Sequence, residues 1–163
     1  MIIYIYIYIY IEYFVYQGYV MDLSAAKPWR WLQIPSLNSG RSSMALVAGG
    51  NILYAIGGLA PDGAALDTAE MLDLNKIDQG WKLLKSRMPG KRQSHAAVHV
   101  NGVILVSGGK DENDQIIRTI WEYDTESCVW KASEDCARTK LGRISPVMLC
   151  CKVISFPRLR ESG

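Results

Sequence analysis

Short apolar runs separated by glycine-rich or polar turns fill most of this chain from residue 29 onward. Two of the runs, 52–56 and 103–106, are continuously apolar, which is typical of strands buried on both faces. They follow the turns Gly49-Gly50-Asn51 and Asn101-Gly102, and the second of these is a strong hairpin signal. The region between the runs has no helical periodicity. The pattern therefore predicts antiparallel sheets made of short strands.

Several landmarks recur along the chain at intervals of about fifty residues. The doublet Gly57-Gly58 recurs as Gly108-Gly109, and Arg41 recurs as Arg92, in both cases 51 residues later. Tryptophans recur with nearly the same period, at Trp31, Trp81 and Trp130. Each unit predicts four strands, at 43–48, 52–56, 68–74 and 81–84 in the first unit and at 94–100, 103–107, 117–123 and 129–131 in the second. Four short strands per unit predict the blades of a β-propeller.

This order of residues resembles the kelch repeat, in which a glycine doublet is followed by a tyrosine and then by a tryptophan. The second unit matches with Tyr123 and Trp130, whereas the first has Leu72 where the tyrosine is expected. The stretch 66–74 is more narrowly similar to the first repeat of the kelch domain-containing protein 8 subfamily. The residues that carry the motif are Gly57, Gly58, Asp73, Trp81, Gly108, Gly109, Tyr123, Asp124 and Trp130.

The resemblance covers about residues 29–131 and implies an all-β fold. We expect a partial kelch propeller with two four-stranded blades and one stray closing strand, at Trp31–Ile34, as a fragment of a ring of about six or seven blades. The expected segments are a low-complexity leader at 1–20, the last strand of an incomplete blade at 21–40, kelch repeats at 41–90 and 91–135, and a truncated third repeat or non-native tail at 136–163.

The leader alternates isoleucine and tyrosine, so both faces of a strand formed from it would be equally apolar and its pairing register weakly specified. Three interpretations of this segment stay open. The first is translated simple-sequence DNA upstream of a natural start at Met21, the second is a signal-anchor, and the third is a real strand. A conventional signal peptide does not fit, because no Lys or Arg precedes Lys27.

Composition narrows the classes of function. The 163 residues include 18 Lys and Arg against 16 Asp and Glu, so the net charge of +2 gives no footprint for nucleic acid. The four cysteines, Cys128, Cys136, Cys150 and Cys151, do not have the spacing of a zinc site. They indicate free thiols in a reducing compartment, with two disulfides as the alternative. We therefore expect a cytoplasmic protein, with a membrane role only if the leader is real.

Candidate chemistry is sparse, and no catalytic, metal or cofactor site is predicted. His95 and His99 share one face of a strand but lack a third ligand, and the acidic loop at 111–114 lacks the calcium-binding pattern. Arg41 and Arg92 are the candidate partner-binding residues, because each opens a blade near the channel end. The alternative is that each guanidinium bonds a backbone carbonyl of the neighbouring blade. Loops 60–65 and 111–115 are a second candidate contact surface.

These observations favour a non-enzymatic module that binds another protein as a scaffold or adaptor. Two alternatives stay open, a substrate receptor of a ubiquitin ligase and a fragment of a kelch-propeller enzyme. The enzyme would need metal ligands or acid–base groups in the channel, and the receptor would need a recruiting domain.

Overall fold

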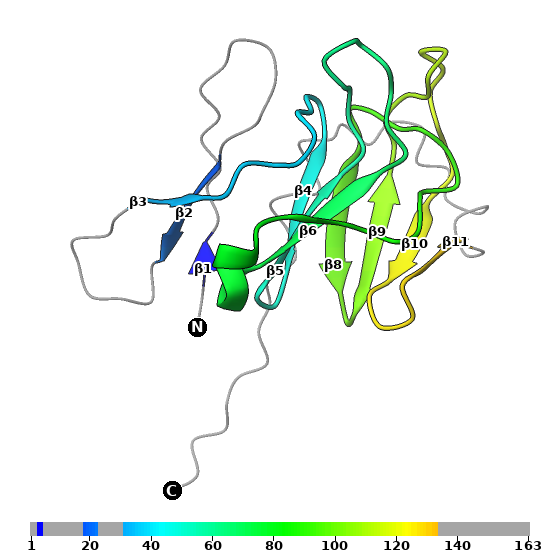
Figure 1. The fold of residues 1–163 in the computed structure, drawn as a ribbon. Coiled ribbons are helices and arrows are strands. Elements are labelled where there is room, and N and C mark those ends of the chain that lie inside the picture. Colours follow the sequence, from blue (N-terminus) through cyan, green and yellow to red (C-terminus); the bar gives the residue numbers. More distant parts are fainter. Residues whose placement is uncertain (1–2, 5–17, 23–30, 134–163) are drawn as a thin grey trace, which may run out of the picture.

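The computed structural model describes residues 3–4, 18–22 and 31–133 of the chain (Figure 1). The N-terminal part forms a three-stranded sheet in the order β1 (Ile3–Tyr4), β2 (Gly18–Asp22) and β3 (Trp31–Ile34), with antiparallel pairs. A strand is therefore present at the predicted position, as β3, and it pairs with β2, which overlaps the end of the predicted leader. The predicted tail at 136–163 and most of the leader lie outside the described residues.

Two four-stranded antiparallel sheets follow, and each has its strands in chain order. Blade 1 contains β4 (Ala45–Gly49), β5 (Ile52–Ile56), β6 (Ala69–Asp73) and β7 (Lys82–Leu83). Blade 2 contains β8 (Ala96–Val100), β9 (Val103–Ser107), β10 (Trp121–Asp124) and β11 (Val129–Ala132). The first strands of the two blades, β4 and β8, lie next to each other. The fold is the all-β partial propeller that the sequence predicted.

Strand boundaries differ from the prediction in three places. The strands expected at 43–48 and 94–100 begin two residues later, because Ser43 and Ser94 both have a φ of 51°, which is incompatible with an extended strand. The strand expected at 117–123 begins only at Trp121. The segment after β6 contains a 3-10 helix, η1 (Leu74–Gln79), which is capped by the Asp73 carboxylate.

Strand β5 is buried on both faces, as its continuous apolar sequence predicted. Leu53 and Ala55 lie in one cluster, which is completed by Ile34, Leu37, Leu72 and Trp81. Tyr54 and Ile56 point the other way and pack against blade 2. Because successive strand residues point to opposite faces, one strand supplies both clusters. Blade 1 is thus the middle layer of a stack.

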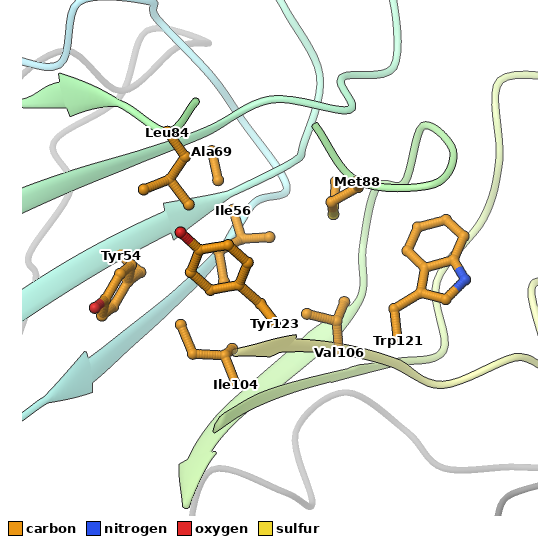
Figure 2. Close-up of a cluster of buried hydrophobic side chains, with 9 residues drawn as sticks. All are labelled: Tyr54, Ile56, Ala69, Leu84, Met88, Ile104, Val106, Trp121 and Tyr123. Carbon is orange, nitrogen blue, oxygen red and sulfur yellow. The ribbon is translucent and has the colours of Figure 1, made fainter. Parts of the chain in front are cut away.

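The interface between the blades is an apolar cluster of nine buried side chains (Figure 2). Blade 1 and the segment after it contribute Tyr54, Ile56, Ala69, Leu84 and Met88, and blade 2 contributes Ile104, Val106, Trp121 and Tyr123. The Tyr123 ring meets Tyr54 edge-on at 6.4 Å between centroids and lies 4.9 Å from Trp130. Burial of these large side chains from both sheets holds the blades face to face.

Ile104 and Leu105 provide a matched test of this interface, since they are neighbours on β9 that point to opposite faces. Ile104 is fully buried against blade 1, whereas Leu105 is half-buried on the other face. We expect Ile104→Ala to lower the free energy of unfolding by about 2–5 kcal/mol, the usual cost of a core cavity. Leu105→Ala should cost clearly less. Urea unfolding followed by tryptophan fluorescence measures both, and equal losses would contradict the assigned orientation of β9.

Candidate functional site

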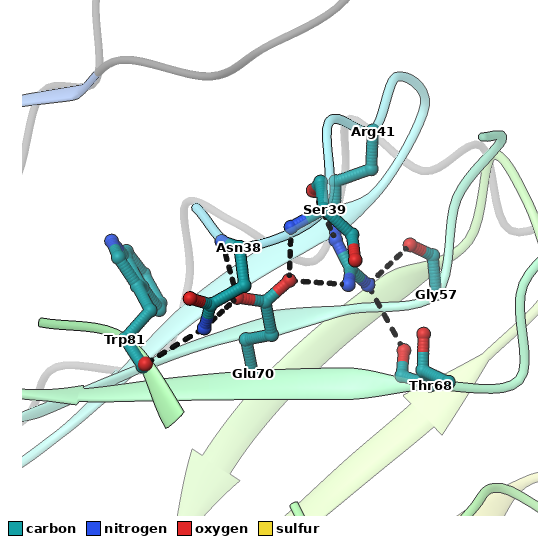
Figure 3. A network of polar contacts seen from close by, with 7 residues as sticks. All are labelled: Asn38, Ser39, Arg41, Gly57, Thr68, Glu70 and Trp81. Carbon is teal, nitrogen blue, oxygen red and sulfur yellow. Dashed lines mark hydrogen bonds and ion pairs between the residues drawn. The ribbon is translucent and has the colours of Figure 1, made fainter. Parts of the chain in front are cut away.

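Arg41 lies at the start of blade 1 with its side chain completely buried (Figure 3). Its guanidinium donates hydrogen bonds to the carbonyl oxygens of Gly57 at 3.2 Å and Thr68 at 3.1 Å. It also forms an ion pair with the equally buried carboxylate of Glu70, at 2.7 Å. Arg41 thereby joins the last residue before the β5–β6 loop to the first residues after it. The charge is removed from water but is fully compensated.

Glu70 in turn fixes the chain segment that precedes blade 1. Its Oε2 accepts hydrogen bonds from the backbone and side-chain nitrogens of Asn38, at 2.8 and 3.0 Å. Its Oε1 accepts a further bond from the backbone N–H of Ser39 at 3.1 Å. The side-chain amide of Asn38 also donates to the Trp81 carbonyl, and the Trp81 indole N–H donates to the carbonyl of Pro35. The network ties this segment to strands β6 and β7.

Arg92 occupies the same position in blade 2 and is also completely buried. It donates to the carbonyl oxygens of Gly108 at 2.8 Å and Thr119 at 3.0 Å. In place of a carboxylate, its guanidinium stacks on the ring of Trp121, 3.9 Å from the ring centroid. Burial lowers the pKa of Arg92 to about 10, so the group stays charged at neutral pH.

The prediction that Arg41 and Arg92 contact a partner is corrected by this geometry. Both side chains are inaccessible, and their N–H groups are directed at carbonyls inside the fold. The alternative was that each guanidinium bonds a backbone carbonyl of the neighbouring blade. Each does bond backbone carbonyls, but these belong to its own blade. The sequence pattern therefore identified a structural pair of arginines. A second arginine at equal spacing is compatible with either role, and only burial distinguishes them.

The two histidines do not come together as ligands. Among the described residues, no group of three or more His, Cys, Asp or Glu is arranged to hold a metal. His95 is buried between the blades, where both ring nitrogens lack a hydrogen-bond partner. Burial, and secondarily the charge of Arg92, lowers its pKa to about 3. His99 is half-buried, and burial lowers its pKa as well. His95 is therefore a neutral packing residue at neutral pH.

The motif glycines and aspartates shape turns. A Cβ at Gly58 would lie 2.3 Å from the Ser42 carbonyl oxygen, and one at Gly109 would lie 2.3 Å from that of Gln93, so only glycine fits. Asp73 and Asp124 accept backbone N–H bonds from the residues that follow them. The hydrogen bonds to Asp124 lower the pKa of its carboxyl group, and the largest contribution comes from the backbone N–H of Ser127.

Polar loops project from one end of the two blades, after β5 and after β9 (Figure 1). We call residues 59–66 and 110–116 the loop surface. In the blade 2 loop, the Asp111 carboxylate accepts hydrogen bonds from the backbone of Asn113 and Gln115, which fixes the turn. Lys91 pairs with Glu112, and Lys110 pairs with Asp114. These ion pairs are exposed and of low stabilising value.

Ile116 stands out in this loop because 74% of it is exposed. Its counterpart in blade 1, Ala65, is buried. The sequence prediction named the loop as far as residue 115 and so missed Ile116. It also missed Lys91, which comes from the segment between the blades and reaches Glu112. The isoleucine pair Ile116-Ile117 directly after a polar loop is the sequence signal that would have indicated this apolar contact point.

Comparison with known proteins agrees with this architecture. The model of the family described as "Kelch motif" matches residues 40–76 and 91–135, together half of the chain. The chain therefore belongs to the kelch-motif family. Within the described residues, no helix is long and apolar enough to cross a membrane.

Individual relatives are more distant. The chain is 25% identical over 116 residues to Kelch-like protein 41a of Danio rerio and 28% identical over 123 residues to Kelch-like protein 34 of Homo sapiens. These matches include 71% and 72% of this chain but only 19% of each relative, so the chain spans about a fifth of their length. Neither relative supports the narrower resemblance to the kelch domain-containing protein 8 subfamily.

A solved structure described as "Structure of YjhT" has a TM-score of 0.64 and 16% identity, over 72% of this chain and 44% of that one. At this identity the likeness concerns the fold alone. It supports the arrangement of the two blades as part of a propeller.

The buried ion pair predicts a large effect of removing one partner. Glu70→Gln leaves the Arg41 guanidinium charged and uncompensated, so we expect the free energy of unfolding to fall by about 3–5 kcal/mol. Asp67→Asn is the control, because its pair with Arg87 is exposed and should be worth about 0–1 kcal/mol. Urea unfolding compares the two variants. A loss below about 1 kcal/mol for Glu70→Gln would show that the ion pair is dispensable.

The buried histidine predicts acid sensitivity. Because the pKa of His95 is about 3 in the folded chain and about 6.5 when unfolded, only the unfolded state takes up a proton between these values. Stability should therefore be complete above pH 6.5 and fall by up to about 1.4 kcal/mol per pH unit as the pH drops toward 4.

His95→Met places at this position the residue type that blade 1 carries as Met44, and it should remove most of that slope. His99→Gln should retain most of it. Unfolding free energies measured from pH 4 to 8 decide the assignment. An unchanged slope in His95→Met would assign the acid sensitivity to other groups.

Proposed function

We propose that this chain is a non-enzymatic protein-interaction module of the kelch class that acts as a scaffold or adaptor. Its contact region is the loop surface, not the two buried arginines. The partner is another protein, and the setting is cytoplasmic. Membership of the kelch domain-containing protein 8 subfamily stays a prediction.

The observation that carries the proposal is the exposure of Ile116 in a loop whose backbone is held by Asp111. Ordering a loop before binding reduces the conformational entropy that association must overcome. An exposed apolar side chain among charged neighbours gives such a loop a site for an apolar anchor of a partner. The Lys91–Glu112 pair connects the loop to the segment between the blades, so both segments form one surface.

Two alternative functions are less well supported than this one. An enzymatic function would have to rest on the likeness to YjhT, which concerns the fold alone. A role as substrate receptor of a ubiquitin ligase needs a recruiting domain in addition to the propeller. The matched relatives are about five times longer than the matched region, so a parent protein of similar length has room for one.

The proposal predicts that partner binding depends on Ile116. Ile116→Ser should leave folding unchanged, because the side chain is exposed, and should weaken binding of a specific partner at least tenfold. Val129→Ser is the matched control, since Val129 is also exposed but is the first residue of β11, paired with Asp124 at the end of blade 2 opposite the loop surface.

Affinity capture with quantitative mass spectrometry identifies proteins lost with Ile116→Ser and kept with Val129→Ser, and titration with the purified candidate gives the affinity ratio. If both variants bind their proteins as the unmodified chain does, the loop surface is not the contact region.

A further inference from the structure

His95 lies at the point from which both loops of the loop surface start, and its side chain is buried. Its ring faces Gly57, where a Cβ would lie 2.8 Å from the Cε1 atom of His95 and 3.0 Å from the methyl group of Met88. A Cβ at Gly109 would lie 2.8 Å from the Cβ atom of His95. Gly57 and Gly109 belong to the glycine doublets that precede the two loops. One buried side chain therefore touches the base of each loop.

The backbone just before His95 is the common attachment of the two loops. The Arg92 carbonyl accepts a hydrogen bond from Gly58 N–H at 2.9 Å, where the blade 1 loop begins. Gln93 and Lys110 exchange two backbone hydrogen bonds, both of 2.9 Å, where the blade 2 loop begins. A displacement of this segment therefore has to break hydrogen bonds at both loops.

The residue that joins this segment to His95 has an unusual backbone. Ser94 has a φ of 51°, in the left-handed region that residues other than glycine seldom adopt. Such a conformation persists only where the surrounding structure holds it. Here Ser94 N–H donates to the Ser43 carbonyl at 2.8 Å, and the next side chain, His95, is anchored in the core. The segment thus depends on this anchor for its conformation.

The ring of His95 is placed where only its neutral form fits. Neither ring nitrogen has a hydrogen-bond partner in the described part of the chain. A protonated imidazole has two N–H donors and a positive charge, so it would need acceptors that this site does not supply.

The charged groups around His95 also oppose a positive ring. In its own segment Arg92 is a buried cation, and no carboxylate among the described residues pairs with it. In blade 1 the guanidinium of Arg41 donates to the carbonyl of Gly57, and its charge is balanced by Glu70. The end of β5, Met88 and Gly109 bring no titratable side chain to the ring.

We propose that His95 is the positioning residue of the loop surface. Its neutral ring, buried between the blades, holds residues 92–94 where both loops need them, and protonation releases the two loops together. The consequence for partner binding rests on the proposed function, since a partner that contacts both loops binds only the closed arrangement. The opening itself is a property of the chain alone.

The size of the effect follows from proton linkage. The pKa of His95 is lowered to about 3, first by burial and then by the charge of Arg92, and the carbonyl of Ile56 offsets only part of this shift. In the open arrangement the exposed ring has a pKa of about 6.5. The open arrangement therefore takes up a proton that the closed one does not, and its population rises as the pH falls. Between pH 7.5 and pH 5.0 the rise should be about thirtyfold.

The test is hydrogen exchange of single amides, followed by NMR on the 163-residue chain at pH 5.0 and 7.5 and corrected for intrinsic exchange rates. Gly58 N–H and Lys110 N–H report on the two loops. Thr125 N–H is the control, because it donates to the Gly102 carbonyl in the turns at the opposite end of blade 2. Protection should fall about thirtyfold at both loops on acidification, with little dependence on low concentrations of urea, and clearly less at Thr125.

Two variants assign the effect to one ring. His95→Met carries the residue type that blade 1 has as Met44 and should remove the pH dependence at both loops. His99→Gln should retain it, because His99 is half-buried on the neighbouring strand and touches neither glycine doublet in the described contacts. The comparison of loop and control amides within the unmodified chain does not depend on the folding of either variant.

Three results would overturn the assignment. An equal fall in protection at Thr125, with the same dependence on urea, would show that acid acts by unfolding the whole chain. A fall at one loop alone would contradict the common attachment. A fall that persists in His95→Met would assign the opening to another group. These measurements need no partner, so they are independent of the binding result for Ile116→Ser.

Discussion

A buried arginine at the start of each blade is the interaction on which this architecture depends. A guanidinium removed from water must find acceptors for its N–H groups, because leaving them unpaired in the interior is costly. Arg41 and Arg92 find acceptors in the carbonyls at the base of the loop that joins the second and third strands, although the Nε–H of Arg92 has no hydrogen-bond partner. Each arginine therefore holds that loop closed at its base. The loops, which carry Ile116 and the paired charges, extend from a fixed position, and this is what makes them suited to recognition.

The two blades compensate the same buried charge in different ways. In blade 1 the guanidinium meets the carboxylate of Glu70, and Asn38 supplies further hydrogen bonds to that carboxylate. In blade 2 it meets the face of Trp121, and the equivalent segment carries Gly90, where a Cβ would lie 3.2 Å from the indole. A small residue is needed beside the large ring, whereas donors are needed beside the carboxylate. The residue beside each arginine and the residue in the preceding segment therefore differ as a pair between the two repeats.

Much of the fold could be predicted from the sequence because it depends on local patterns. Continuous apolar runs at β5 and β9 identified strands buried on both faces, and the glycine doublets marked their ends. The late start of β4 and β8 could not be predicted, since the left-handed backbone of Ser43 and Ser94 follows from contacts between blades. The role of the arginines was also outside the reach of spacing alone, because residues 16 and 27 positions away supply their acceptors.

The sequence by itself determined the period of the repeat, the number of strands in each blade and the family, because short-range hydrophobic patterning and turn chemistry are written along the chain. Only the tertiary structure decided which side chains are accessible. It buried Arg41, Arg92 and His95 and exposed Ile116. The physical reason is that burial arises where two sheets meet, and that meeting brings together residues from separate repeats. A polar side chain at the start of a strand is a contact residue or a structural one according to what the neighbouring segments place beside it.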